Sequence, residues 1–269
     1  MKLTFKKLAT IAGLASLLAL TGCGENSTDS NKIKVAVMAG AEAQVAEVAA
    51  KVAKEKFDLD VELVTFTDYV TPNAALDDGS VDINAFQHKP YLDQQVIDRG
   101  YKLQIAGNTF VYPIAGYSKQ VTSVDEIQEG SRIAVPNDPT NLGRSLILLE
   151  QQGLITLKEG AGLSATVRDI ATNPKNIEII ELDAAQLPRS LDDVALSIIN
   201  TTYASSINLT PEKDGIFVES KESPYVNLIV AREDNVNAEN VQNFVKAYQT
   251  EEVYKAAFDT FNGGIVKGW

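Results

Sequence analysis

Short apolar strands alternate with amphipathic helices along most of this 269-residue chain, and that alternation limits the folds open to it. Residues 33–38 favour a strand, and a helix is expected over 43–56 because its apolar residues recur at helical spacing. An α/β fold with mainly parallel sheets is therefore predicted. Further strands are expected over 59–66, 81–86, 132–135, 177–182, 195–199 and 226–231.

The pattern begins again after about residue 118, which predicts a second lobe. An apolar stretch over 105–117 is interrupted by Pro113, and Ser123 to Glu126 then fits a capping box. The last two helices are too few to form a third core, so the chain is expected to return to the first lobe. Lobe 1 is thus expected over 32–115 and 226–269, and lobe 2 over 116–225. Two crossover segments of this kind form a hinge over a ligand-closing cleft.

The N-terminus has the pattern of a bacterial secretory signal peptide over residues 1–22. Three lysines precede an apolar run from Leu8 to Leu20, which is shorter than the ~20 residues that a membrane-spanning helix needs. The sequence Leu20-Thr-Gly-Cys23 resembles a lipobox, so Cys23 is expected to carry lipid as the first mature residue. The alternative is a secreted protein with an incidental thiol. Lipidation is favoured because the sequence holds no second cysteine for a disulfide.

Residues 23–31 are small and polar after the cysteine, and they are expected to form a lipidated tether. Removal of residues 1–22 leaves 21 basic and 36 acidic side chains, a formal net charge of −15. Such a surface repels nucleic acid and anionic lipid, so no nucleic-acid partner is expected. Membrane attachment is then expected through the lipid on Cys23.

Aromatic residues and the one histidine gather where strands are expected to end. His88 lies between Phe86 and Tyr91, and Tyr69 follows the preceding strand in a similar position. The ends of strands in α/β sheets are common ligand sites. These side chains are therefore candidates to line an apolar slot, and the alternative is that they fill the core beneath the loops.

Polar candidates come from the second lobe and from the returning strand. Asn141 and Arg144 share one face of a helix that is expected to begin near residue 141, after a proline-rich turn. A helix N-terminus with an arginine suits a carboxylate, although an exposed arginine on a solvated face is the alternative. Asn200 and Asn227 adjoin apolar strands, and their amides can bind an ammonium or a carboxylate.

The sequence gives little support to an enzyme. It has no Gly-x-Ser-x-Gly elbow, no phosphate-binding loop and no dinucleotide glycine motif. One histidine and no usable cysteine make a zinc site a poor expectation, and no cofactor or metal is predicted. A serine hydrolase that uses His88, or a surface adhesin, is the alternative.

Several ordered motifs closely resemble the methionine-binding lipoproteins of bacterial methionine ABC transporters, the NLPA lipoprotein family. They are the segments 66–73, 84–92, 135–144, 223–227 and 267–269. The resemblance implies a type II periplasmic-binding-protein fold that captures methionine and delivers it to a membrane permease and its ATPase. It implies ligand contacts at Tyr69, Phe86, His88, Tyr91, Asn141, Arg144, Asn200 and Asn227. The arginine and asparagines would hold the amino-acid head, and the aromatic residues with His88 would enclose the thioether.

Several expectations rest on this resemblance and leave alternatives open. The ligand is expected to be methionine, as the L or the D enantiomer. Another amino acid or a methionine-containing peptide is the alternative. The protein is expected to be a monomer anchored to the inner membrane and facing the periplasm. Gly24 follows the lipidated cysteine where aspartate would be a retention signal, so the outer membrane or a Gram-positive surface stays open.

Overall fold

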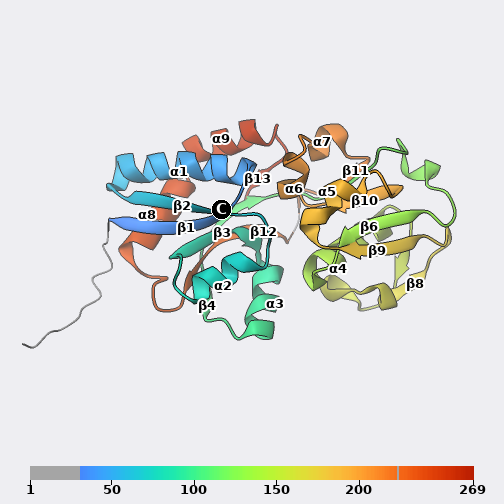
Figure 1. Cartoon of the computed structure of the whole chain (residues 1–269), viewed down its shortest axis with the longest axis horizontal. Coiled ribbons are helices and arrows are strands. Elements are labelled where there is room, and N and C mark those ends of the chain that lie inside the picture. Colours follow the sequence, from blue (N-terminus) through green and yellow to red (C-terminus); the bar gives the residue numbers. More distant parts are fainter. Residues whose placement is uncertain (1–30, 223) are drawn as a thin grey trace, which may run out of the picture.

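The computed structural model describes residues 31–222 and 224–269 and shows two α/β lobes side by side (Figure 1). The predicted signal peptide, Cys23 and residues 24–30 of the predicted tether lie outside the described residues, as does Ser223. None of the helices in the described part of the chain is long and apolar enough to cross a membrane. The predicted α/β class with two lobes is confirmed.

The first lobe is built on a six-stranded sheet whose order is β13-β4-β12-β3-β1-β2. Strand β1 runs parallel to β2 and β3, whereas β12 is antiparallel to both β3 and β4. The last large strand of the chain thus lies in the middle of the sheet. The strands are β1 (Lys32–Met38), β2 (Asp60–Phe66), β3 (Ile83–His88), β4 (Leu103–Val111), β12 (Val226–Arg232) and β13 (Val266–Lys267).

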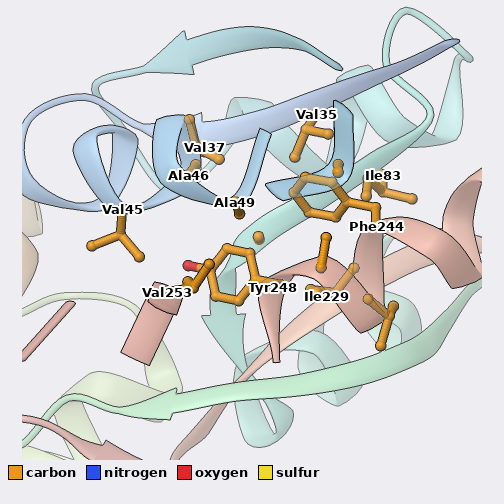
Figure 2. Close-up of a cluster of buried hydrophobic side chains, with 14 of the residues drawn as sticks. Val35, Val37, Val45, Ala46, Ala49, Ile83, Ile229, Phe244, Tyr248 and Val253 are labelled. Atoms are coloured by element: carbon orange, nitrogen blue, oxygen red, sulfur yellow. The ribbon is translucent and has the colours of Figure 1, made fainter. Parts of the chain in front are cut away.

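Helices cover both faces of this sheet, because its central strands are apolar on both sides. On β1, Val35 and Val37 belong to the cluster that contains α1, whereas Ala36 belongs to the cluster on the other face. Figure 2 shows Phe244 and Tyr248 from α8 beside Val35 and Ala49. Each such fully buried large side chain stabilises the fold by roughly 1.5–3 kcal/mol. One face carries α1 (Ala41–Phe57), α8 (Glu239–Tyr248) and α9 (Glu251–Thr260), and the other α2 (Thr71–Asp77) and α3 (Lys89–Arg99).

The second lobe is built on a five-stranded sheet with the order β11-β5-β10-β6-β9. Ile133 and Val135 on β6 pack on one face with α4, and Ala134 packs on the other with α5 and α6. The strands are β5 (Ala115–Tyr117), β6 (Arg132–Pro136), β9 (Glu178–Leu182), β10 (Leu196–Ile199) and β11 (Phe217–Val218), with a separate hairpin of β7 (Thr156–Leu157) and β8 (Ile170–Thr172). The α-helices are α4 (Pro139–Gln151), α5 (Leu187–Ser190), α6 (Thr201–Ser205) and α7 (Pro211–Asp214).

Three local predictions differ from the structure. Both sheets are mixed rather than mainly parallel, because β5, β11, β12 and β13 enter antiparallel. The stretch 105–117 is divided between β4 in one sheet and β5 in the other, with Pro113 in the break. Ser123 makes no side-chain cap; a capping box is instead formed by Thr166 and Asp169.

The two connections between the lobes meet at the border, where residues 112–114 of the first lie beside Glu219 of the second. The Glu219 backbone N–H donates to the Ile114 carbonyl over 2.9 Å, and the Ile114 N–H donates to a Glu219 carboxylate oxygen over 3.4 Å. Crossover segments that run together in this way let two lobes rotate about one line. The border between the sheets is where a ligand site is expected.

Candidate functional site

A cavity lies between the lobes, where residues at the ends of strands from both sheets face each other. All eight residues singled out in the sequence line it: Tyr69, Phe86, His88, Tyr91, Asn141, Arg144, Asn200 and Asn227.

One wall of the cavity is aromatic and comes from the first lobe. The ring centroids of Tyr69 and Phe86 are 5.9 Å apart, and those of Phe86 and Tyr91 are 6.1 Å apart. The Tyr91 hydroxyl donates to the Tyr69 carbonyl over 2.8 Å, which ties the two loops together. These residues also pack in a buried cluster, so they contribute to the hydrophobic core as well as lining the cavity.

His88 ends β3 and caps α3, and this role fixes its tautomer. Its Nδ1 accepts the Tyr91 backbone N–H over 3.1 Å, so Nδ1 carries no proton. The Nε2 atom therefore donates to Asn141 Oδ1 across the cavity, over 3.2 Å. Burial, together with the Arg144 charge, lowers the pKa of His88 to about 3, so the imidazole is neutral at pH 7.

Asn141 joins three parts of the site. Its Oδ1 accepts from His88 of the first lobe and from Asn200 Nδ2, the latter over 2.9 Å. Its Nδ2 and its backbone N–H donate to Asp138, the N-cap of α4. Burial raises the pKa of Asp138, and the hydrogen bonds from Asn141 and Thr140 oppose that effect. The helix begins at Pro139, two residues earlier than predicted.

Arg144 is buried rather than solvated, with 4 % of its surface exposed. Its Nε donates to Glu219 over 2.8 Å, and its Nη2 donates to Glu219 and, over 3.0 Å, to the Tyr112 carbonyl. Its guanidinium carbon lies 4.2 Å from the centroid of the Tyr225 ring. None of the hydrogen bonds within residues 31–222 and 224–269 uses Nη1, so the Nη1 group remains for a ligand.

Asn200 and Asn227 contribute side-chain amides from opposite sides of the cavity. Asn227 Nδ2 donates to the Phe86 carbonyl over 3.0 Å. Asn200 Oδ1 is buried and has no hydrogen-bond partner among the described residues. A buried acceptor without a donor costs about 1–3 kcal/mol. An ammonium in the cavity would supply that donor.

Four further residues line the cavity that sequence reasoning did not select: Gln87, Tyr112, Thr201 and Thr202. Gln87 directly precedes His88, and the two threonines directly follow Asn200. Their places next to predicted site residues could have identified them in the sequence. Gln87 is part of a buried amide network with Asn73 and Asn84. Glu219, which holds Arg144, had no local signal because its partner is 75 residues away.

The contacts of His88 leave it poorly placed to act as a general base. Both ring nitrogens of His88 are engaged, one by Tyr91 and one by Asn141, which leaves neither to activate a serine. Within the described residues no group of His, Cys, Asp and Glu side chains is placed to hold a metal ion. A cationic edge, an acceptor amide and an aromatic wall together fit a small zwitterion with an apolar side chain.

Comparisons with known proteins give one consistent result. The model of the NlpA lipoprotein family matches residues 33–269. A relative from Vibrio cholerae, named probable D-methionine-binding lipoprotein MetQ, is 79 % identical over the full length of both chains. A nutrient-binding protein from Burkholderia cenocepacia, solved bound to methionine, is 51 % identical with a TM-score of 0.87, covering 88 % of this chain and 100 % of that one. A periplasmic substrate-binding protein of an ABC transporter from Coxiella burnetii is 47 % identical with a TM-score of 0.86, over the same shares.

Proposed function

Because the chain belongs to the NlpA lipoprotein family, we propose that it is a substrate-binding lipoprotein that captures methionine between its lobes and delivers it to an ABC importer. The observation that carries this proposal is the interlobe cavity with a buried arginine at one end and an aromatic wall at the other. The chain is a carrier and not an enzyme, since His88 is engaged on both sides.

The amino-acid head is assigned to the polar end of the cavity. The free Nη1 group of Arg144 would take the carboxylate, and Asn200 Oδ1 would accept from the ammonium. One edge of Arg144 is held by Glu219, so the ligand meets an arginine whose orientation is already fixed. Preorganisation of this kind reduces the entropy cost of binding.

The thioether is assigned to the wall formed by Tyr69, Phe86 and Tyr91. Sulfur in contact with an aromatic ring contributes about 0.3–1.5 kcal/mol. His88 borders this wall and is neutral, so it adds no charge that would have to be desolvated.

The partners and location follow from the same proposal. The protein would be a monomer, held to the membrane by the lipid on Cys23 and the tether 23–31. It would face the periplasm, and we prefer the inner membrane to the outer. The importer would consist of a permease and an ATPase. We place lobe 1 at 32–115 and 226–269 and lobe 2 at 116–225, because the strands of the two sheets divide close to these positions.

The test is to identify what the purified protein carries. Denaturation of the purified protein should release free methionine, which mass spectrometry identifies. A chiral assay of that methionine then distinguishes the L from the D form. Calorimetry with methionine, a second apolar amino acid and a methionine dipeptide then ranks the ligands. A stronger response to the dipeptide, or none to any amino acid, would reject the proposal in this form.

A further inference from the structure

Glu42 lies behind the cavity wall, at the border between the lobes. It belongs to the first turn of α1 in the first lobe, and 3 % of its surface is exposed. Its Oε1 accepts a hydrogen bond from the hydroxyl of Thr202, which lines the cavity from the second lobe. The two residues come from different lobes, so separation of the lobes breaks this bond.

The position of the Thr202 hydroxyl is fixed by its neighbours on α6. Thr201 donates to the Pro113 carbonyl over 2.5 Å, which ties α6 to the first crossover segment. The Tyr203 hydroxyl donates to the Thr67 carbonyl over 3.4 Å, and its ring centroid is 4.9 Å from that of Tyr69. The first turn of α6 therefore forms a compact contact with the first lobe, and Glu42 is part of it.

The described part of the chain places no compensating positive charge at Glu42 in this contact. The titratable groups that interact with it are the phenols of Tyr69, Tyr112, Tyr203 and Tyr248. None of the ion pairs within residues 31–222 and 224–269 includes Glu42. The N-terminus of α1 and the Thr202 hydroxyl favour the carboxylate, but desolvation outweighs them and raises the pKa of Glu42 to about 8.

We propose that Glu42 is a positioning residue whose protonated carboxyl, held by Thr202, joins the two lobes around the ligand, so that closure takes up a proton. This proposal rests on the proposed function, because it requires that methionine binds by closing the lobes. The hydrogen bond from Thr202 connects Glu42 to the lining of the cavity. Glu42 would stabilise the closed arrangement of the lobes without contacting the ligand directly.

The sign of the pH dependence follows from the pKa in the two states. Burial in the closed arrangement raises the pKa of Glu42 to about 8, and separation of the lobes would expose the carboxyl and return its pKa toward 4.5, so the closed form would hold more protons between these values. Methionine affinity should therefore fall as the pH rises through this window, by up to about tenfold per pH unit. His88 acts oppositely, since burial lowers its pKa from 6.5 to about 3 and closure releases its proton. Between pH 6.5 and 8 the opposing effect of His88 on affinity is at most about twofold, whereas that of Glu42 exceeds about tenfold.

The experiment is calorimetry of methionine binding by the full chain at pH 7, in two buffers with different protonation enthalpies. We expect more than half a proton taken up per methionine bound. Glu42→Gln should take up none, and its methionine affinity should change by no more than about twofold from pH 6.5 to 8. The matched control is Glu47→Gln, an exposed position on the same helix, which should keep the proton uptake of the parent chain.

Substitutions at Thr202 give a second measurement that leaves Glu42 in place. Thr202→Ser keeps the hydroxyl and should retain the parent pH profile. Thr202→Val removes the donor, so it should weaken affinity at pH 7 and extend the pH dependence above pH 8.

The outcomes separate the two proposals. Methionine binding with equal proton uptake in the parent chain and in Glu42→Gln would overturn the role of Glu42 and leave methionine capture intact. If Glu42→Gln does not fold, an unchanged affinity and pH profile in Thr202→Val overturns that role. An absence of methionine binding by the parent chain at every pH would reject the proposed function, and the role of Glu42 with it.

Discussion

Individual side chains of the cavity are held mainly by other protein groups before any ligand is considered. Asn141 uses its carbonyl oxygen for His88 and Asn200 and its NH₂ for Asp138. Arg144 uses one edge for Glu219. The asparagine was predicted as a ligand contact from its place on the helix, and its hydrogen bonds suggest that it also organises the site. That prediction remains to be tested by a ligand complex.

Replacing Arg144 tests the head-group assignment. We expect Arg144→Ala to weaken methionine binding by about 2–5 kcal/mol, because a buried carboxylate would lose its cation. The same change leaves Glu219 buried without its partner, which should lower the free energy of unfolding by about 3–5 kcal/mol. Calorimetry and urea unfolding measure the two effects.

Two further variants separate binding from stability at this position. Arg144→Ala combined with Glu219→Gln should recover part of the stability but not the affinity, because the buried negative charge is removed. Arg168→Ala, at an exposed arginine of the same lobe, should change neither quantity. Full methionine affinity in Arg144→Ala would remove this residue from the site.

The length of a helix or strand determined whether it could be predicted from the sequence. The 17-residue α1 and the strand β1 have long, regular apolar patterns, and both were predicted within a few residues. The short α6 and β11 have too few residues to show a period, and neither was predicted. The antiparallel entry of β12 depends on contacts with β3 and β4, far away in the sequence. The candidate cavity residues could be chosen because they follow recognisable strands.

Helix α4 offers a test of how an element positions the site. A Cβ atom on Gly143 would lie 2.2 Å from the Leu163 carbonyl oxygen, which is backbone. Glycine to alanine within a helix usually stabilises by about 0.5–1 kcal/mol, but this clash should dominate. We expect Gly143→Ala to lower the free energy of unfolding by about 1–3 kcal/mol and to weaken methionine binding, because Asn141 and Arg144 flank it.

Urea unfolding and calorimetry check this expectation against Gln151→Ala, at an exposed position on the same helix. That control should alter stability only slightly. A Gly143→Ala variant as stable as the parent chain would show that residues 162–165 can move away from α4 without cost.

At the scale of the whole molecule, attachment and charge have separate roles. Without the predicted signal peptide the chain would carry a formal net charge of −15, so it would not be drawn to an anionic bilayer. The lipid on Cys23 and a tether of at most about 26 Å beyond it would then keep a carrier close to its importer.

The anchor is tested by Cys23→Ala in cells that lack the importer. The variant should appear in the soluble fraction, whereas the parent chain should sediment with membranes. Fractionation and immunoblotting measure the distribution, and methionine binding by the soluble variant serves as the control for folding. Continued sedimentation of a folded variant would disprove attachment through this cysteine.

The central place of β12 in the first sheet also constrains the order in which the molecule can be made. Until residues 226–232 leave the ribosome, β3 and β4 have no strand between them, and each presents an unpaired edge. The N-terminal lobe therefore cannot complete its folding ahead of the C-terminal part, as many N-terminal domains do during synthesis. The first lobe is therefore completed only after its last strands have been made.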